Sequence, residues 1–159
     1  MPNSGATNPA ASSKSNMHVP FSGAKIAIFF GEKVLVHHRD NKPNIPNPNM
    51  WDFPGGRREG EETAFECVKR ELFEEFGLTL NENQVLFSKP YPSVINPGTN
   101  GWLVVAKMDE ADQEKIKFGD EGQAFDFCTP EEILTSDTFV PYLKERFRDY
   151  YEHRDINNG

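Results

Sequence analysis

The stretch that decides the fold is residues 55–78, GGRREGEETAFECVKRELFEEFGL. From about Glu62 to Phe76 its apolar residues recur at helical spacing, and at about 100° per residue four of them fall on an arc of roughly 80°. These four are Phe65, Val68, Leu72 and Phe76. Gly77 follows, and a glycine in the left-handed conformation commonly ends a helix. The stretch therefore predicts an amphipathic helix that packs its apolar stripe against the protein.

Three glutamates, Glu71, Glu74 and Glu75, gather on an arc next to this stripe. Carboxylates this close repel one another by some tenths of a kcal/mol per exposed pair, so we expect a cation beside them. Hard divalent cations such as Mg²⁺ bind carboxylate oxygens and bridge to substrate phosphates. Arg70 lies four residues before Glu74 and is expected to form an ion pair with it. Without further evidence, a solvated acidic face would explain the same residues.

The spacing of the fixed residues adds that evidence. Gly56, Glu62, the run 70–72, the pair 74–75 and the pair 77–78 reproduce the Nudix box, so the chain resembles the Nudix hydrolase family in its MutT-like branch. The resemblance implies an α/β fold, a Nudix-type α/β/α sandwich with a mixed β-sheet. It also implies hydrolysis of a nucleoside diphosphate linked to another group, with divalent metal, usually Mg²⁺ and alternatively Mn²⁺.

The same resemblance implies roles for the box residues. The metal would be held by three carboxylates and one carbonyl, those of Glu71, Glu74, Glu75 and Gly55. Glu62 would brace the loop before the helix, Arg70 would orient a carboxylate, and Gly56 and Gly77 would be structural. Metal ions neutralise charge on phosphoryl oxygens and lower the pKa of a bound water. A carboxylate would take the proton of that water, and which one does so stays open.

Three candidates lie beside these. Residues 119–123, GDEGQ, resemble a loop of the MutT branch whose glutamate joins the metal site, so Glu121 is a candidate metal ligand or catalytic base. An acidic turn is the alternative for so short a match. Arg39 follows a predicted strand much as a substrate-contacting arginine does in MutT-like members, although a solvated arginine is an equal alternative. Arg57, inside the box, is the second candidate for substrate binding.

A small sheet is predicted around the box. Residues 24–30 and 33–38 are apolar or alternating runs joined by a tight turn at 31–32, as in a hairpin. Residues 41–50 hold three prolines and four asparagines, which predicts a loop. Further strands are expected at 84–87, 102–107 and 124–128, and further helices from 129 and at about 140–151. His37 and His38 would point to opposite faces of their strand and are expected to be structural.

Composition limits the function. A chain of 159 residues, 36% hydrophobic and 26% charged, suits one soluble domain. The formal net charge of -8 argues against a nucleic-acid partner, because nucleic-acid binders usually carry a basic face. No apolar run approaches the roughly 20 residues that span a bilayer, and the chain does not open on a leader pattern. A cytoplasmic protein with no membrane partner is therefore expected. Cys67 and Cys128 show no zinc or disulfide spacing.

Residues 1–20, rich in Asn, Ser, Ala and Pro, are expected to form a disordered tail, and residues 21–159 the Nudix domain. The expected partner is a small-molecule nucleotide, first a nucleoside triphosphate, oxidised purine forms included, cleaved to NMP and pyrophosphate. ADP-ribose and NADH or another dinucleotide are the alternatives. For NADH or another dinucleotide the reason is that residues 88–93, SKPYPS, partly match the NADH pyrophosphatase branch. A Nudix-fold sensor that binds a nucleotide without cleaving it is the non-enzyme alternative. A homodimer is also compatible with the sequence.

Overall fold

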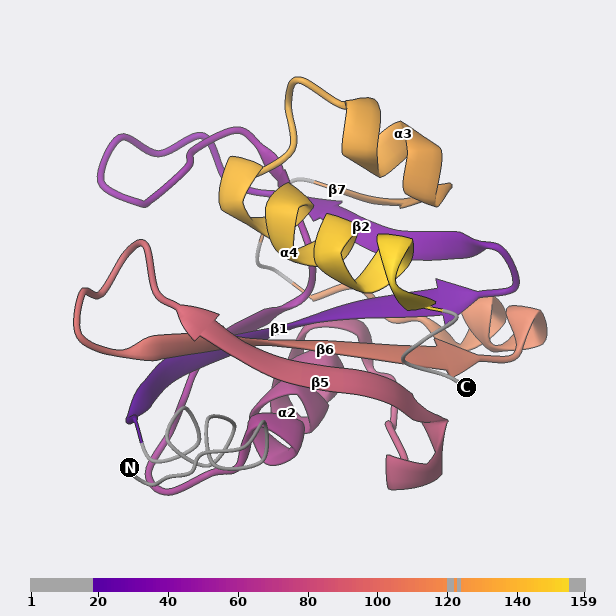
Figure 1. Cartoon of the computed structure of the whole chain (residues 1–159). Coiled ribbons are helices and arrows are strands. Elements are labelled where there is room, and N and C mark those ends of the chain that lie inside the picture. Colours follow the sequence, from indigo (N-terminus) through magenta and orange to yellow (C-terminus); the bar gives the residue numbers. More distant parts are fainter. Residues whose placement is uncertain (1–18, 120–121, 123, 155–159) are drawn as a thin grey trace.

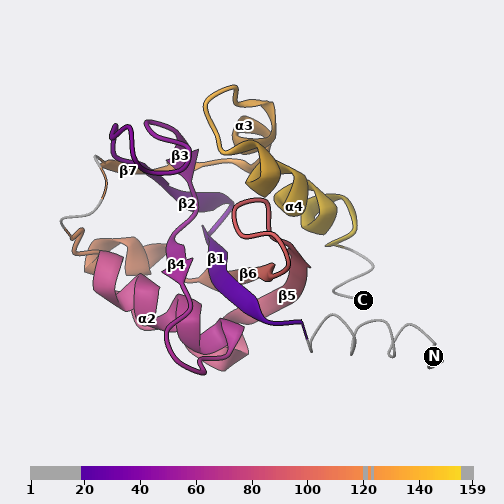
Figure 2. The same cartoon turned by 90° about the vertical axis from the view of Figure 1, so that its left-hand side faces the viewer.

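One mixed sheet with helices on both faces forms the molecule (Figure 1). The structure is a computed structural model and describes residues 19–119, 122 and 124–154. Figures 1 and 2 show α2 on one face of the sheet and α3 and α4 on the other. The predicted α/β/α sandwich is confirmed. The predicted tail falls almost entirely outside the described residues, so the proposed division at residue 20 stays a prediction.

Seven strands make the sheet: β1 (Phe21–Phe30), β2 (Lys33–His38), β3 (Trp51–Asp52), β4 (Gly55–Arg57), β5 (Val85–Pro92), β6 (Asn100–Met108) and β7 (Ala124–Cys128). Their order is β3-β2-β1-β6-β5, with β4 paired to β1 and β7 to β2. β1 and β6 are parallel, and the other pairs are antiparallel. The helices are α2 (Ala64–Phe76), α3 (Pro130–Thr135) and α4 (Pro141–Glu152), with two 3₁₀ turns, η1 (Glu82–Gln84) and η2 (Glu110–Lys115).

The predicted hairpin is confirmed, because β1 and β2 pair antiparallel up to Phe30 and Lys33. β5 is longer than predicted. The prediction ended at residue 87, yet the strand continues to Pro92 and includes the prolines at 90 and 92. β5 ends the order of paired strands, and an edge strand tolerates residues that cannot donate to a neighbour.

Alternation along β1 separates two hydrophobic clusters. One lies between the sheet and α2 and contains Ala24, Ile26, Ile28, Val68, Leu72 and Phe76. The other lies between the sheet and α4 and contains Ala27, Leu103, Val105, Leu143 and Phe147. Because successive side chains of a strand point to opposite faces, the even residues of β1 from Ala24 to Phe30 belong to the first cluster, and Ala27 and Phe29 pack in the second.

α2 begins at a capping box and ends where predicted. Thr63 accepts a hydrogen bond from the Glu66 backbone, and the Glu66 side chain accepts one from the Thr63 backbone. Gly77 has φ 67° and donates its N–H to the Phe73 carbonyl. The predicted stripe is correct except at its first member. Phe65 is half-buried, and Cys67 is buried instead because α2 packs against β4, where the Cys67 thiol contacts the Gly56 and Arg57 carbonyls.

Candidate active site

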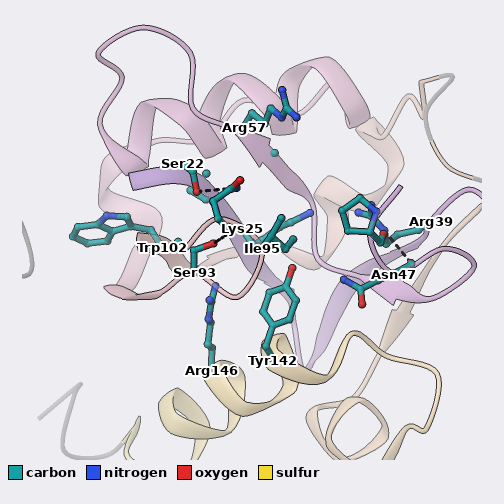
Figure 3. A pocket seen from close by; sticks show the side chains of 16 residues that line it. Ser22, Lys25, Arg39, Asn47, Arg57, Ser93, Ile95, Trp102, Tyr142 and Arg146 are labelled. Carbon is teal, nitrogen blue, oxygen red and sulfur yellow. Dashed lines mark hydrogen bonds between the residues drawn. The ribbon is translucent and has the colours of Figure 1, made fainter. Parts of the chain in front are cut away.

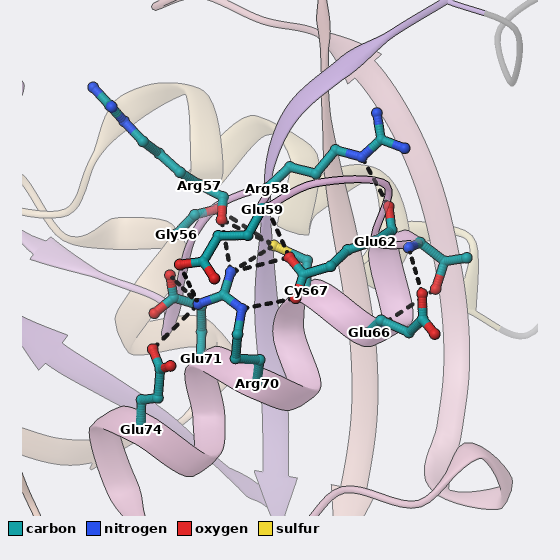
Figure 4. Close-up of polar contacts among 11 residues, drawn as sticks. Gly56, Arg57, Arg58, Glu59, Glu62, Glu66, Cys67, Arg70, Glu71 and Glu74 are labelled. Carbon is teal, nitrogen blue, oxygen red and sulfur yellow. Dashed lines mark hydrogen bonds and ion pairs between the residues drawn. The ribbon is translucent and has the colours of Figure 1, made fainter.

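The three predicted metal-binding glutamates lie in different surroundings on α2. Glu71 and Glu75 lie against β4, and Figure 4 shows Glu74 beside Arg70. Glu74 is exposed, Glu71 is mostly shielded and Glu75 is buried. Glu75 Oε1 accepts a hydrogen bond of 3.4 Å from the backbone N–H of Gly55. The main chain of Gly55 and the Glu75 carboxylate are therefore adjacent, although they are 20 positions apart in the chain.

Gly56 allows the second close approach between β4 and α2. A β-carbon at Gly56 would lie 2.0 Å from Glu71 Oε2 and 2.7 Å from its carboxyl carbon. Any larger residue at position 56 would occupy the space of that carboxylate. The glycine is therefore required so that the Glu71 carboxylate can approach β4, and not because the backbone has an unusual conformation there. Two of the three glutamates, Glu75 and Glu71, thus lie against the main chain of Gly55–Gly56.

Arg70 forms ion pairs with several glutamates on this side of α2 (Figure 4). Its Nε donates to Glu62 Oε2 at 2.7 Å, and its Nη1 lies 3.2 Å from Glu74 Oε1 and 3.5 Å from Glu71 Oε2. The hydrogen bond from Arg70 lowers the pKa of Glu62, and the same bond raises the pKa of Arg70. The predicted ion pair with Glu74 is present. Arg70 is at the same time anchored to the preceding loop by Glu62, and by Glu59 at 3.3 Å.

Glu62 occupies the position expected of a brace. Its Oε1 accepts the backbone N–H of Glu59 at 2.8 Å, and its backbone carbonyl accepts the Nε of Arg58 at 2.8 Å. Arg70 Nη2 also donates to the Arg57 carbonyl at 2.8 Å. The loop between β4 and α2 is thereby tied to the helix at both of its ends.

The donor atoms of this face fit a divalent cation in type. Within the described ranges, no three His, Cys, Asp or Glu side chains are arranged as a ready cation site. Arg70 Nη1 lies near the carboxylates of both Glu71 and Glu74 and offsets part of their negative charge. Carboxylates of one helical turn beside a main-chain segment are nevertheless the oxygen ligands that Mg²⁺ prefers. Glu121, the candidate from the GDEGQ loop, lies outside the described residues.

A pocket of about 250 Å³ opens between the sheet and α4 (Figure 3). Its lining comes from β1, β4, the start of β6, the loop after β5 and the inward side of α4: Ser22, Gly23, Lys25, Gly56, Arg57, Ser93, Ile95, Asn96, Gly101, Trp102, Tyr142 and Arg146, with Arg39 and Asn47 at one side. Gly56 belongs to both sites, since its backbone lines the pocket and its α-carbon faces Glu71. The pocket and the acidic side of α2 therefore meet at β4.

The pocket lining is cationic. It includes Lys25, Arg39, Arg57 and Arg146, and no Asp or Glu is among its residues. Behind it lies Asp52, which accepts from Lys25 Nζ and Arg39 Nη1, each at 2.9 Å. Burial raises the pKa of Asp52, but the nearby cations outweigh it and hold that pKa below its usual value. One buried carboxylate against four cations leaves a site suited to phosphate oxygens.

Arg39, predicted to contact substrate, lines the pocket, but its guanidinium is bonded to other groups of the protein. Besides the ion pair with Asp52, its Nε donates to the carbonyls of Pro46 at 3.0 Å and Asn47 at 3.2 Å. It therefore holds the predicted 41–50 loop against the sheet. Arg57 is the other predicted contact. It lies on β4 at the rim of the pocket, and Figure 3 shows its guanidinium directed away from Lys25 and Tyr142.

Four residues of the site escaped the sequence reasoning: Lys25, Asp52, Tyr142 and Arg146. A lysine inside an otherwise apolar central strand was a usable signal. Arg146 lies one turn after Tyr142 and directly before Phe147 in the predicted last helix, and a cation among these aromatic residues was a second signal. Asp52 offered none, because its partners are 27 and 13 positions away.

Comparisons with known proteins show the family and the fold. The profile of the NUDIX domain family matches residues 21–150. The crystal structure of a MutT protein from Methanosarcina mazei is 20% identical, with a TM-score of 0.65 over 86% of this chain and 97% of that one. A bifunctional NMN adenylyltransferase/ADP ribose pyrophosphatase from Francisella tularensis, complexed with AMP and a Mn ion, is 20% identical, with a TM-score of 0.54 over 86% of this chain and 40% of that one.

Among curated sequences, an uncharacterised protein of Acanthamoeba polyphaga mimivirus is 42% identical over 53 residues, 31% of this chain. That match spans 14% of the length of the viral protein. In the part of the chain that the structure describes, none of the helices has the length and apolar character needed to cross a membrane.

Proposed function

The chain belongs to the Nudix family of hydrolases, which act on phosphorus acid anhydrides, and on this premise we propose that it cleaves a nucleoside triphosphate to NMP and pyrophosphate with Mg²⁺. Oxidised purine nucleotides are the first candidates. We also expect the enzyme to act in the cytoplasm on small-molecule nucleotides. Family members generally use divalent metals, and Mn²⁺ is a plausible substitute for Mg²⁺.

One observation carries the proposal: Gly56 joins a cationic pocket to the glutamates of the Nudix box. On one side of β4 the pocket contributes Lys25 for phosphate oxygens, and Arg57 lies at its rim. Glu71 lies against the same strand from the other side. A polyphosphate bound in the pocket would thus extend across β4 toward carboxylates.

The expected chemistry follows from these positions. Glu71, Glu74, Glu75 and the Gly55 carbonyl would hold the divalent cation, with Glu121 as a further candidate. When bound, that cation neutralises charge on phosphoryl oxygens and lowers the pKa of a water. One carboxylate takes the proton of the attacking water while the phosphorus–oxygen bond to pyrophosphate breaks. Arg70 keeps its neighbouring carboxylates oriented, and Lys25 and Arg57 hold the substrate.

A substrate panel tests the proposal. Nucleoside triphosphates, an 8-oxo purine triphosphate, ADP-ribose and NADH are compared by kcat/KM with Mg²⁺ and with Mn²⁺, with NMP and pyrophosphate measured as products. We expect the highest kcat/KM for a triphosphate, with equal amounts of the two products. A higher value for ADP-ribose or NADH would transfer the assignment to that alternative. Tight nucleotide binding without hydrolysis of any compound would overturn the enzyme assignment in favour of a sensor.

The glutamates are tested with variants that keep their shape. Glu74→Gln and Glu75→Gln are each expected to lower kcat by about 10²-fold or more, the scale of losing one strong electrostatic contact in a catalytic site. Glu82→Gln, in η1 and away from the site, serves as the control and should keep wild-type kcat. Near-normal turnover in both α2 variants would contradict the metal assignment.

A further inference from the structure

Arg146 is a buried cation that lacks a carboxylate partner within the described residues. It is 7% exposed and lines the pocket from α4 (Figure 3). Its Nη2 donates to the Pro92 carbonyl at 3.1 Å, and its guanidinium carbon lies 4.9 Å from the Tyr142 ring centre and 5.4 Å from that of Tyr91. These contacts give the Arg146 guanidinium one carbonyl oxygen and two aromatic rings as partners.

These contacts leave most of the guanidinium's hydrogen-bonding capacity unused. Arginine has five N–H donors, and buried charges are normally paired. Cation–π contacts contribute about 0.5–2 kcal/mol, well short of the cost of burying a charge. Lys25 and Arg39, by comparison, share the buried Asp52. Burial lowers the pKa of Arg146, but that pKa starts so high that the group stays charged.

Arg146 lies at the end of the pocket away from the glutamates. Arg57 pairs with Gly23 on β1, and Gly23 pairs with Gly101 on β6, so Arg57 and Gly101 are two strands apart. At the usual strand spacing this is about 10 Å. A β-carbon at Gly101 would lie 3.0 Å from Arg146 Nη1, which places the guanidinium over bare backbone. Arg146 therefore faces the part of a substrate remote from the anhydride that breaks.

The groups around Arg146 are hydrogen-bond donors as well. Tyr142 directs its hydroxyl into the pocket in Figure 3, and the described residues give that hydroxyl no hydrogen-bond partner. Ser93 lines the same end, with a hydroxyl that can donate. A guanidinium with two hydroxyls and no carboxylate is complementary to an anionic oxygen group, and charge-assisted hydrogen bonds are the strong ones.

We propose that Arg146, together with Tyr142, is a specificity-determining site that binds a second phosphate carried by the nucleoside end of the substrate. The proposal rests on the proposed function only in that a nucleotide occupies this pocket. This site would favour substrates that carry a phosphate on the ribose as well as the phosphates that lie near the acidic side of α2.

Calorimetric titration without divalent metal, in the presence of a chelator, tests the site apart from hydrolysis. The probes are AMP, adenosine 2′,5′-bisphosphate and adenosine 3′,5′-bisphosphate, which differ only in the second phosphate. We expect wild-type protein to bind one bisphosphate at least about 10-fold more tightly than AMP, because a buried phosphate–arginine contact is charge-assisted. Arg146→Gln should abolish that advantage, so that the variant binds AMP and the two bisphosphates with equal affinity.

Two further variants keep the test decisive if Arg146→Gln lowers the melting temperature. Tyr142→Phe removes only a hydroxyl and should reduce the bisphosphate advantage by about threefold, within the range for one hydrogen bond to a charged group. Arg148 is a partly exposed arginine on the same helix that pairs with Glu145, and Arg148→Gln should keep the whole advantage.

Three results would overturn the inference. The first is equal wild-type affinity for AMP and both bisphosphates. The second is an advantage that survives in both Arg146→Gln and Tyr142→Phe. The third, measured with GMP as an additional probe, is a preference for GMP over AMP that Arg146→Gln removes, with no gain from a second phosphate, because arginine also pairs with guanine O6 and N7. Bisphosphate binding as predicted, combined with no hydrolysis in the substrate panel, would leave this site standing and reject the enzyme assignment alone.

Discussion

Gly56 is the residue on which the two halves of the site depend. Its missing side chain admits the Glu71 carboxylate, and its backbone lines the pocket. In Gly56→Ala the new β-carbon would occupy the space of Glu71 Oε2, so the carboxylate must move by an ångström or more. We expect kcat to fall by about 10²-fold, the effect of a displacement near 1 Å in a catalytic group. Steady-state kinetics with Mg²⁺ measure it.

Gly60→Ala is the matched control from the same loop. Gly60 has φ +56°, and a β-carbon there meets nothing within 4 Å. Its cost is backbone strain of about 1–2 kcal/mol, which lowers the melting temperature and leaves kcat unchanged. Equal kcat in both alanine variants would show that Glu71 needs no contact with Gly56.

His37 makes stability depend on pH. It is buried, and among the described residues its Nε2 has no hydrogen-bond partner. Burial lowers the pKa of His37 to about 4 from an ordinary 6.5. The unfolded chain therefore binds the proton first as pH falls, so stability is complete above pH 6.5 and is lost between 6.5 and 4. We expect a loss of about 2 kcal/mol from this group between pH 7 and pH 4.5.

Urea unfolding of wild type and His37→Gln at the two pH values measures this loss. The variant should show a shallower pH dependence, while His153→Gln, at an exposed position, should follow wild type. Parallel curves for wild type and His37→Gln would mean that His37 is protonated to the same degree in the folded and unfolded chain.

At the scale of elements, α2 is held at its start by a capping box that is separate from its catalytic turns. Thr63→Ala removes the cap on the Glu66 N–H and should cost about 1 kcal/mol of unfolding free energy. Because Glu71 and Glu74 lie beyond the first turn, kcat should stay near wild type. Thr129→Ala breaks the same motif in α3, outside the site, and is the reference. A large drop in kcat for Thr63→Ala would show that the cap positions the glutamates.

The sequence predicted elements where local chemistry decides them. The turn at 31–32, the left-handed Gly77 and the box spacing all act within a few residues, and all were located correctly. β5 was cut short, because its prolines are compatible with a strand only at a sheet edge, and edge position is a property of the whole sheet. Tyr142 and Arg146 were missed as site residues for the same reason: which face of α4 meets the pocket depends on distant strands.

At the scale of the whole molecule, the acidic excess predicts a stabilising effect of metal. A cation that binds the folded chain and not the unfolded one raises stability by mass action, by about 2.7 kcal/mol at 100 times its Kd. We expect Mg²⁺ to raise the melting temperature of wild type, and a chelator to reverse this. The shift should shrink in Glu74→Gln and Glu75→Gln. An equal Mg²⁺ shift in all three proteins would place the bound cation away from α2.

The two clusters on opposite faces of the sheet have a consequence for how such a protein can change over time. Substitutions in α4 and in the loop after β5 alter the pocket without disturbing the packing of α2, since the sheet stands between them. New substrate preferences can therefore arise on one face while the hydrolytic residues on the other stay fixed. Libraries that vary positions 93–96, 142 and 146 together are the natural starting point for redirecting this enzyme by laboratory evolution.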